Sequence, residues 1–135
     1  MTSPECVAVI QECKEQSLQG EISFPEVVRR LHAVSVERYH LDLTRDETTY
    51  YLPSGESYVL ATGGPREVIA ESFDAAAVER TVRAIQRGEI LFPEFLRRIM
   101  AAGCVGYFTQ ITGRRVQYVG RTGEMHIENF PTLTA

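Results

Sequence analysis

The 135-residue sequence contains an internal repeat with an offset of 68 residues. Residues 20–31 read GEISFPEVVRRL, and residues 88–99 read GEILFPEFLRRI. Over the ungapped alignment of residues 20–59 with 88–127 there are 14 identities in 40 positions, where typical residue frequencies would give about two or three. Such self-similarity indicates that one supersecondary unit is used twice. The sequence therefore predicts a tandem duplication of one module, with the two copies related by a pseudo-two-fold axis.

Each copy is predicted to consist of two helices followed by three short strands. Helices are expected to begin at serine, aspartate or proline residues, which either cap the first turn or fit into it, namely Ser3-Pro4, Phe24-Pro25, Asp74 and Phe92-Pro93. Gly20 and Gly88 are typical residues for helix ends. Strands are expected where apolar and polar residues alternate, at residues 36–43, 48–52, 57–61, 104–111, 116–120 and 125–130. The predicted fold class is α+β, with antiparallel sheets packed on helices and with Phe24 and Phe92 in the core.

The length and composition favour one domain over residues 1–135. The chain is 44% hydrophobic and 24% charged, as in ordinary globular proteins, and it is long enough to bury a core without disulfides or metals. The two repeats would cover about residues 1–61 and 69–130, joined by a segment that contains Gly63-Gly64-Pro65. Residues 67–73 in this connection could form one further strand.

Charge and cysteine content restrict the location and the partners. A net charge of −4 makes nucleic-acid binding unfavourable, because that function needs a basic surface. No apolar run approaches the roughly 20 residues of a membrane span, and the first residues lack the pattern of a secretory signal. Three cysteines without a CxxC spacing do not suggest a disulfide framework. The sequence therefore predicts a cytoplasmic protein without membrane or nucleic-acid partners.

The turns suggest which residues share a side of the sheet. Two-residue turns at Gly113-Arg114 and Thr122-Gly123 would place Thr109, Tyr118 and Ile127 on the core side, and this side would also include Tyr107, Met125, Ile111 and Val116. The opposite side would then carry Phe108, Gln110, Gln117, Val119, His126 and Glu128 and, by transfer to the first copy, His40, Asp42, Thr49, Tyr51, Tyr58 and Leu60.

This second side mixes aromatic, amide, imidazole and acidic groups. It is compatible with a solvated sheet face, with a subunit interface such as that of a homodimer, or with a ligand or catalytic site. Residues with a chemical role should differ between the copies, and His40, Asp42 and His126 align with Phe108, Gln110 and Tyr58. The predicted ligand-binding residues are His40, Asp42, Tyr51, Gln110, Gln117 and His126.

Several chemistries are open to these residues. His40 and Asp42, two positions apart on one strand, suit a base with its orienting acid or, together with His126, a metal site. Their spacing matches no established motif, and no cofactor or metal is predicted. Cys104 aligns with Val36 and is interpreted as a small buried hydrophobic residue rather than a nucleophile. The leading interpretation is a binding module for a small ligand or a partner protein. The alternative is a small metal-dependent or hydrolase-like enzyme that uses His40, Asp42 and His126.

Stretches from both copies resemble a known bacterial family of unknown function, the YdfO-like family. The resemblance rests on the stretches FPEVV, ERYH, TYYLPSGE, AAGCVGY and GRRVQY and extends over nearly the whole chain. The family is often found in prophage regions and is often labelled "phage envelope protein", although this sequence has neither a signal nor an apolar span to match an envelope. The resemblance implies an α+β fold and implies no activity and no site residues.

Overall fold

The computed structural model describes residues 2–131, which form four helices and one six-stranded antiparallel sheet. The α+β fold class is therefore confirmed. In chain order the elements are α1 (Pro4–Gln19), α2 (Phe24–Ala33), β1 (Arg38–Asp42), β2 (Glu47–Tyr51), β3 (Ser57–Ala61), α3 (Ala75–Gln86), α4 (Phe92–Ala101), β4 (Cys104–Gln110), β5 (Arg115–Gly120) and β6 (Met125–Asn129). Within residues 2–131, no helix combines the length and the hydropathy that a membrane crossing requires.

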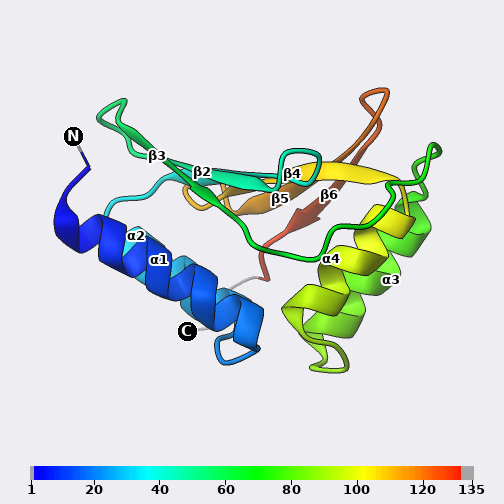
Figure 1. Ribbon diagram of the computed structural model, residues 1–135, viewed down its shortest axis with the longest axis horizontal. Helices are drawn as coiled ribbons and strands as arrows, with labels where there is room; N and C mark the ends of the chain where they lie inside the picture. Colours follow the sequence, from blue (N-terminus) through cyan, green and yellow to red (C-terminus); the bar gives the residue numbers. More distant parts are fainter. Residues whose placement is uncertain (1, 132–135) are drawn as a thin grey trace.

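The strand order is β3-β2-β1-β4-β5-β6, so that the central pair β1–β4 joins the two halves of the chain. Each half supplies two helices and then three strands. The four helices lie on one side of the sheet, and no helix of the described chain lies on the other (Figure 1). We call the uncovered side the outer face and the other the helix side. The duplication and the pseudo-two-fold axis stay predictions.

The predicted helix starts are confirmed. Ser3 and Ser23 accept hydrogen bonds from the backbone N–H groups of Cys6 (3.2 Å) and Glu26 (3.4 Å), and Asp74 accepts one from Ala77 (3.0 Å). These side chains satisfy backbone donors that have no partner within the helix. The fourth helix, α4, begins at Phe92, and the preceding residue Leu91 provides no side-chain cap, although a proline occupies the first turn.

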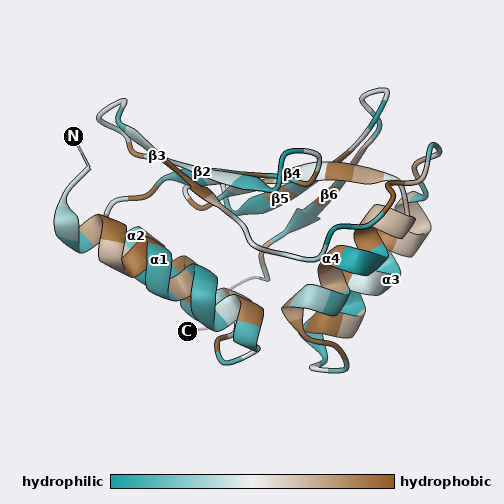
Figure 2. Ribbon diagram, viewed as in Figure 1, coloured by the Kyte–Doolittle hydropathy of each residue, from teal (hydrophilic) through white to brown (hydrophobic). Residues whose placement is uncertain are grey.

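Four tyrosines form the centre of the core on the helix side. Tyr39, Tyr50, Tyr107 and Tyr118 are each 5–7% exposed, and they come from the four inner strands β1, β2, β4 and β5. Each helix carries both hydrophobic and hydrophilic residues (Figure 2), and the buried hydrophobic ones belong to the same core cluster as the tyrosines. The residues with 0–1% exposure that the helices contribute are Ile10, Leu31, Val78, Leu96, Ile99 and Met100.

Phe24 does not lie in the core, so its predicted burial is wrong. Its side chain is 41% exposed, and its ring meets the ring of Phe130 edge to face at a centroid distance of 5.4 Å. Phe92 is partly buried at the edge of the core. Both phenylalanines occupy the first position of a helix, which lies at the rim of the helix layer. The core position is one turn further, where Phe95 is 4% exposed.

Residues 67–73 form no strand, contrary to the sequence expectation. The N–H of Ala70 donates to the carbonyl of Met100 near the end of α4 (3.1 Å). The Arg121 guanidinium donates to the carbonyls of Ile69 (2.5 Å) and Ala70 (3.2 Å). These three backbone groups of the segment are thus bonded to a helix end and a hairpin loop, rather than to a neighbouring strand.

The predicted register of the outermost hairpins is wrong by one residue. The N–H of Gly120 donates to the carbonyl of Glu124 (2.8 Å), which leaves a three-residue loop where a two-residue turn was expected. As a result Tyr118 pairs with His126 instead of Ile127. The first half behaves in the same way, because Tyr50 pairs with Tyr58.

A shift by one residue moves every side chain of a strand to the other side of the sheet. The residues that therefore face the helices instead of the outer face are His126, Glu128, Tyr58 and Leu60. Met125 and Ile127, expected in the core, lie on the outer face with 48% and 43% exposure. Between β4 and β5 the register differs from the expected one by two residues, so the predicted sides are kept there.

The different burial of Phe95, inside α4, and Phe24, at the start of α2, gives a stability prediction. Phe95→Ala should lower the free energy of unfolding by about 3–5 kcal/mol, because it opens a cavity in the core. Phe24→Ala should cost only about 1 kcal/mol, the range of an exposed aromatic contact. Urea unfolding followed by circular dichroism measures both variants. Equal losses for the two variants would show that the rim position is as buried as the core position.

Candidate functional site

The side chains of the outer face lie in three rows across the sheet. The rows follow directly from the strand registers. The middle row is Val59, Thr49, His40, Phe108, Gln117 and Ile127. The row on one side of it is Ser57, Tyr51, Arg38, Gln110, Arg115 and Asn129, and the row on the other side is Ala61, Glu47, Asp42, Gly106, Val119 and Met125. Five of the six predicted site residues share this face.

His40 and Phe108 form the centre of the outer face. They are direct neighbours on β1 and β4, and their rings stack at a centroid distance of 4.2 Å with an angle of 8° between planes. Burial lowers the pKa of His40 below its usual value of 6.5, and the nearby Asp42 carboxylate opposes this effect. The imidazole is therefore neutral at pH 7. Among the described residues its ring has no hydrogen-bond partner.

The remaining predicted residues are engaged with their neighbours. The side-chain amide of Gln110 donates to the Gln117 oxygen (3.0 Å). The guanidinium of Arg38 lies over the Tyr51 ring, 4.3 Å from its centroid, and pairs with Glu37. These contacts orient the side chains of Gln110, Gln117 and Tyr51 relative to their neighbours on the sheet.

Asp42 has a structural role that the sequence analysis missed. Its Oδ1 accepts hydrogen bonds from the backbone N–H groups of Thr44 (3.0 Å) and Arg45 (3.1 Å). This is the usual way in which an aspartate stabilises a turn that follows it. The carboxylate still faces the outer side of the sheet, beside His40, through the alternation of β1.

A shallow, open hollow lies next to the central pair, on the side of Asp42. It is lined mainly by apolar atoms with a few polar groups, from His40, Asp42, Arg45, Gly106, Phe108 and Val119. The hollow exists because Gly106 contributes no side chain to its row. Arg45 at the rim is paired with Glu47 (3.1 Å), so two carboxylates and one guanidinium border this end of the face.

His126 lies on the helix side and belongs to a different cluster. Its Nε2 is 2.7 Å from Oε1 of Glu128, and Oε2 of Glu128 is 3.0 Å from the guanidinium of Arg83 on α3. The side chains of His126 and Glu128 are only 18% and 12% exposed. This cluster fastens α3 to the edge strand β6. Only the His-x-Glu spacing hinted at it in the sequence, because Arg83 lies 45 residues away.

The positions of Cys104 and of the possible metal ligands bear on two of the chemistries considered from the sequence. Cys104 is 0% exposed, as predicted, and burial raises the pKa of its thiol to about 11. Within residues 2–131, no three His, Cys, Asp or Glu side chains are grouped so that they could hold a metal ion.

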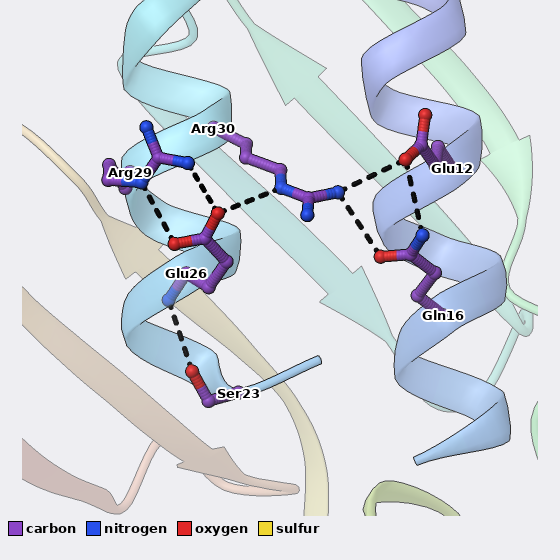
Figure 3. Close-up of polar contacts among 6 residues, drawn as sticks. All are labelled: Glu12, Gln16, Ser23, Glu26, Arg29 and Arg30. Carbon is purple, nitrogen blue, oxygen red and sulfur yellow. Dashed lines mark hydrogen bonds and ion pairs between the residues drawn. The ribbon is translucent and has the colours of Figure 1, made fainter. Parts of the chain in front are cut away.

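A second polar cluster lies between α1 and α2 and involves the repeated glutamate and arginine pair (Figure 3). Glu26 pairs with Arg29 and with Arg30 (3.0 Å), and Arg30 continues to Glu12 on α1 (3.1 Å). In the second half, Glu94 makes the same helical pairs with Arg97 and Arg98. Because the arrangement occurs twice, we interpret it as helix stabilisation rather than as a site.

Comparison with known protein families identifies the family of the chain. Residues 5–129 match the family model described as "Protein of unknown function (DUF1398)". The chain belongs to the DUF1398 family. The predicted membership of a family of unknown function is thereby confirmed, whereas the resemblance to the YdfO-like family stays a prediction. No curated protein matches the sequence.

The cluster on the helix side of this DUF1398 domain gives a second prediction. Arg83→Met should lower the free energy of unfolding by about 1–3 kcal/mol, because it leaves the nearly buried Glu128 carboxylate without its guanidinium. The matched control is Arg80→Met on the exposed face of the same helix, which should change stability by less than about 0.5 kcal/mol. Urea unfolding compares the two, and equal losses would show that the Glu128 contact contributes nothing.

A third prediction concerns pH. The hydrogen bonds from Arg29 and Arg30 lower the pKa of Glu26 from 4.5 to about 2. A lowered folded-state pKa contributes stability above the unfolded-state value, and this contribution is lost as the pH falls toward about 2. Glu26→Gln should therefore be less stable than the parent at pH 7, with a difference that shrinks below about pH 4.

The control for this experiment is Glu71→Gln, which removes an exposed carboxylate outside the helices. NMR titration of the side-chain carboxyl carbons measures the pKa of Glu26 directly. A titration midpoint near 4.5 for Glu26 would contradict the assigned ion pairs. A loss of stability in Glu26→Gln that is the same at pH 7 and at acidic pH would contradict them as well.

Proposed function

We propose that this domain is a cytoplasmic binding module and that its ligand or partner docks on the outer face around His40 and Phe108. The proposal rests mainly on one observation, a hollowed centre of an uncovered sheet, bordered by a neutral imidazole without a hydrogen-bond partner among the described residues. A few oriented polar groups in a mostly apolar surface are typical of binding sites. Exposed Val59, Met125 and Ile127 extend the apolar surface to both edges of the sheet.

We also propose that the two halves of the chain are a tandem duplication, and the pairing of the two central strands supports this. Residues 38–42 of β1 pair with residues 106–110 of β4 in antiparallel register, with His40 opposite Phe108. His40 and Phe108 are also 68 positions apart, which is the offset of the repeat. A two-fold axis between the copies would therefore pass through this pair. A residue on such an axis would lie opposite its own counterpart in the other copy. Here the two counterparts differ, because one is a histidine and the other a phenylalanine.

The enzyme alternative is less well supported than the binding proposal by the positions of its residues. Its three residues were His40, Asp42 and His126, and His126 faces the helices while the other two face outward. Groups on opposite sides of a sheet do not converge on one substrate. Asp42 is also engaged with the turn that follows β1. We therefore favour binding over catalysis, and we include His40, Asp42, Tyr51, Gln110 and Gln117 in the site.

The proposal is tested by NMR titration of the ¹⁵N-labelled protein with probes of different chemical classes. The probes are indole, acetate, inorganic phosphate, arginine and zinc chloride, each raised to about 20 mM except the metal, so that even millimolar sites are occupied. We expect at least one class to shift the backbone amides of β1, β4 and β5 around the outer face. A zinc response that involves both His40 and His126 would instead favour the enzyme alternative.

The control is the double variant His40→Ala with Gln117→Ala. The double variant should fold normally, because side chains outside the core usually contribute less than about 1 kcal/mol to the free energy of unfolding. Its affinity for the responding probe should be about tenfold weaker or more. If no probe affects the outer face, or if the responses map to the helix side, the binding proposal fails. Concentration-dependent shifts of the same amides without any probe would identify a second copy of the chain as the partner.

A further inference from the structure

Corresponding positions in the two halves are filled in opposite ways on the outer face. Arg38 on β1 lies opposite Tyr51 on β2, and Gly106 on β4 lies opposite Val119 on β5. Both pairs of positions, 38 with 106 and 51 with 119, are separated by the repeat offset of 68. In the first half a guanidinium therefore lies on a tyrosine ring, 4.3 Å from its centroid. In the second half the same place is the hollow.

The backbone keeps this place open. A Cβ atom on Gly106 would lie 2.6 Å from the carbonyl oxygen of Leu41, closer than such atoms approach one another. The chain therefore cannot fill the hollow with a side chain of its own at this position. The same Cβ position is 3.4 Å from Nε2 of His40, which shows that this nitrogen borders the hollow.

The charges around the hollow favour a cation. Asp42 is the neighbour of Gly106 on β1, whereas the neutral Gln110 is the neighbour of Arg38 on β4. The one cationic side chain at the rim, Arg45, already pairs with Glu47. The Asp42 carboxylate uses Oδ1 for the turn, and a ligand would approach it from the hollow.

We propose that the hollow binds a guanidinium group, held by the Asp42 carboxylate against the apolar wall of Phe108 and Val119. This inference rests on the proposed function, because it assigns a ligand class to the same face. A guanidinium fits better than an ammonium, since it is planar, weakly hydrated and able to lie against apolar and aromatic surfaces while it donates to a carboxylate. The group belongs either to a free guanidino compound or to an arginine side chain of a partner protein.

The experiment is an NMR titration of the ¹⁵N-labelled full chain with a matched pair of probes, N-acetyl-arginine amide and N-acetyl-citrulline amide. The two differ only in the charged guanidinium and its neutral urea counterpart. We expect the arginine probe to shift the amides of residues 42–45, 104–108 and 119, with an apparent Kd in the millimolar range or tighter, and the citrulline probe to bind at least about tenfold more weakly.

The variant Asp42→Asn removes the charge and keeps an oxygen that can accept the turn hydrogen bonds. It should weaken binding of the arginine probe about tenfold, whereas Glu71→Gln, with the same change in net charge, should leave it unchanged. Equal binding of the two probes, arginine shifts centred elsewhere, or undiminished binding to a folded Asp42→Asn protein would overturn the inference. If Asp42→Asn does not fold, the comparison of the arginine and citrulline probes on the parent protein is sufficient to test the inference.

A further arm of the titration separates the two sources of the group. Free L-arginine that binds more tightly than the blocked probe indicates a small guanidino compound, because its amino and carboxylate groups then contribute. Equal or tighter binding of the blocked probe indicates an arginine of a partner protein. If arginine has no effect while indole, acetate or phosphate shifts the same amides, the guanidinium inference fails and the binding proposal stands.

Discussion

The pairing of β1 with β4 is the interaction on which the rest of the structure depends. It connects two three-stranded sheets, one from each half of the chain, into a single six-stranded sheet. A small sheet needs a covered hydrophobic face to be stable. Because side chains alternate along each strand, the joined sheet presents Tyr39, Tyr50, Tyr107 and Tyr118 on one side. All four helices must then pack on that side, which leaves the outer face uncovered.

Local signals in the sequence were sufficient for most of the secondary structure, although not for residues 67–73, and for most of the core. Helix starts follow from capping side chains at Ser3, Ser23 and Asp74, whose effect depends on neighbours within the same turn. The sides of the inner strands follow from alternation, and the tyrosines are buried as expected. The same local signals were not enough for Phe24, because its burial depends on where the start of α2 lies relative to the whole helix layer.

The outer strands could not be placed because their hairpin loops are ambiguous in sequence. Thr122-Gly123 is compatible both with a two-residue turn and with a three-residue loop that has glycine at positive φ, and Gly123 has φ of 90° in the longer loop. A difference of one residue in loop length decides which side chains of β6 face the helices and which lie on the outer face. This difference places His126 on the helix side with Glu128 and Arg83, whereas His40, Asp42, Tyr51, Gln110 and Gln117 lie on the outer face as expected.

The hollow was hidden in the sequence for a different reason, since it consists of a missing side chain. Gly106 is significant only once the register places it between Asp42 and Val119. The register of β4 shifts between Cys104 and Gly106, a local irregularity that strands often show beside functional sites. Close contact with the Leu41 carbonyl then requires glycine at this position. The hollow is thus determined by the backbone of the two central strands. A surface fixed in this way needs little reordering when a ligand binds, so that more of the contact energy contributes to affinity.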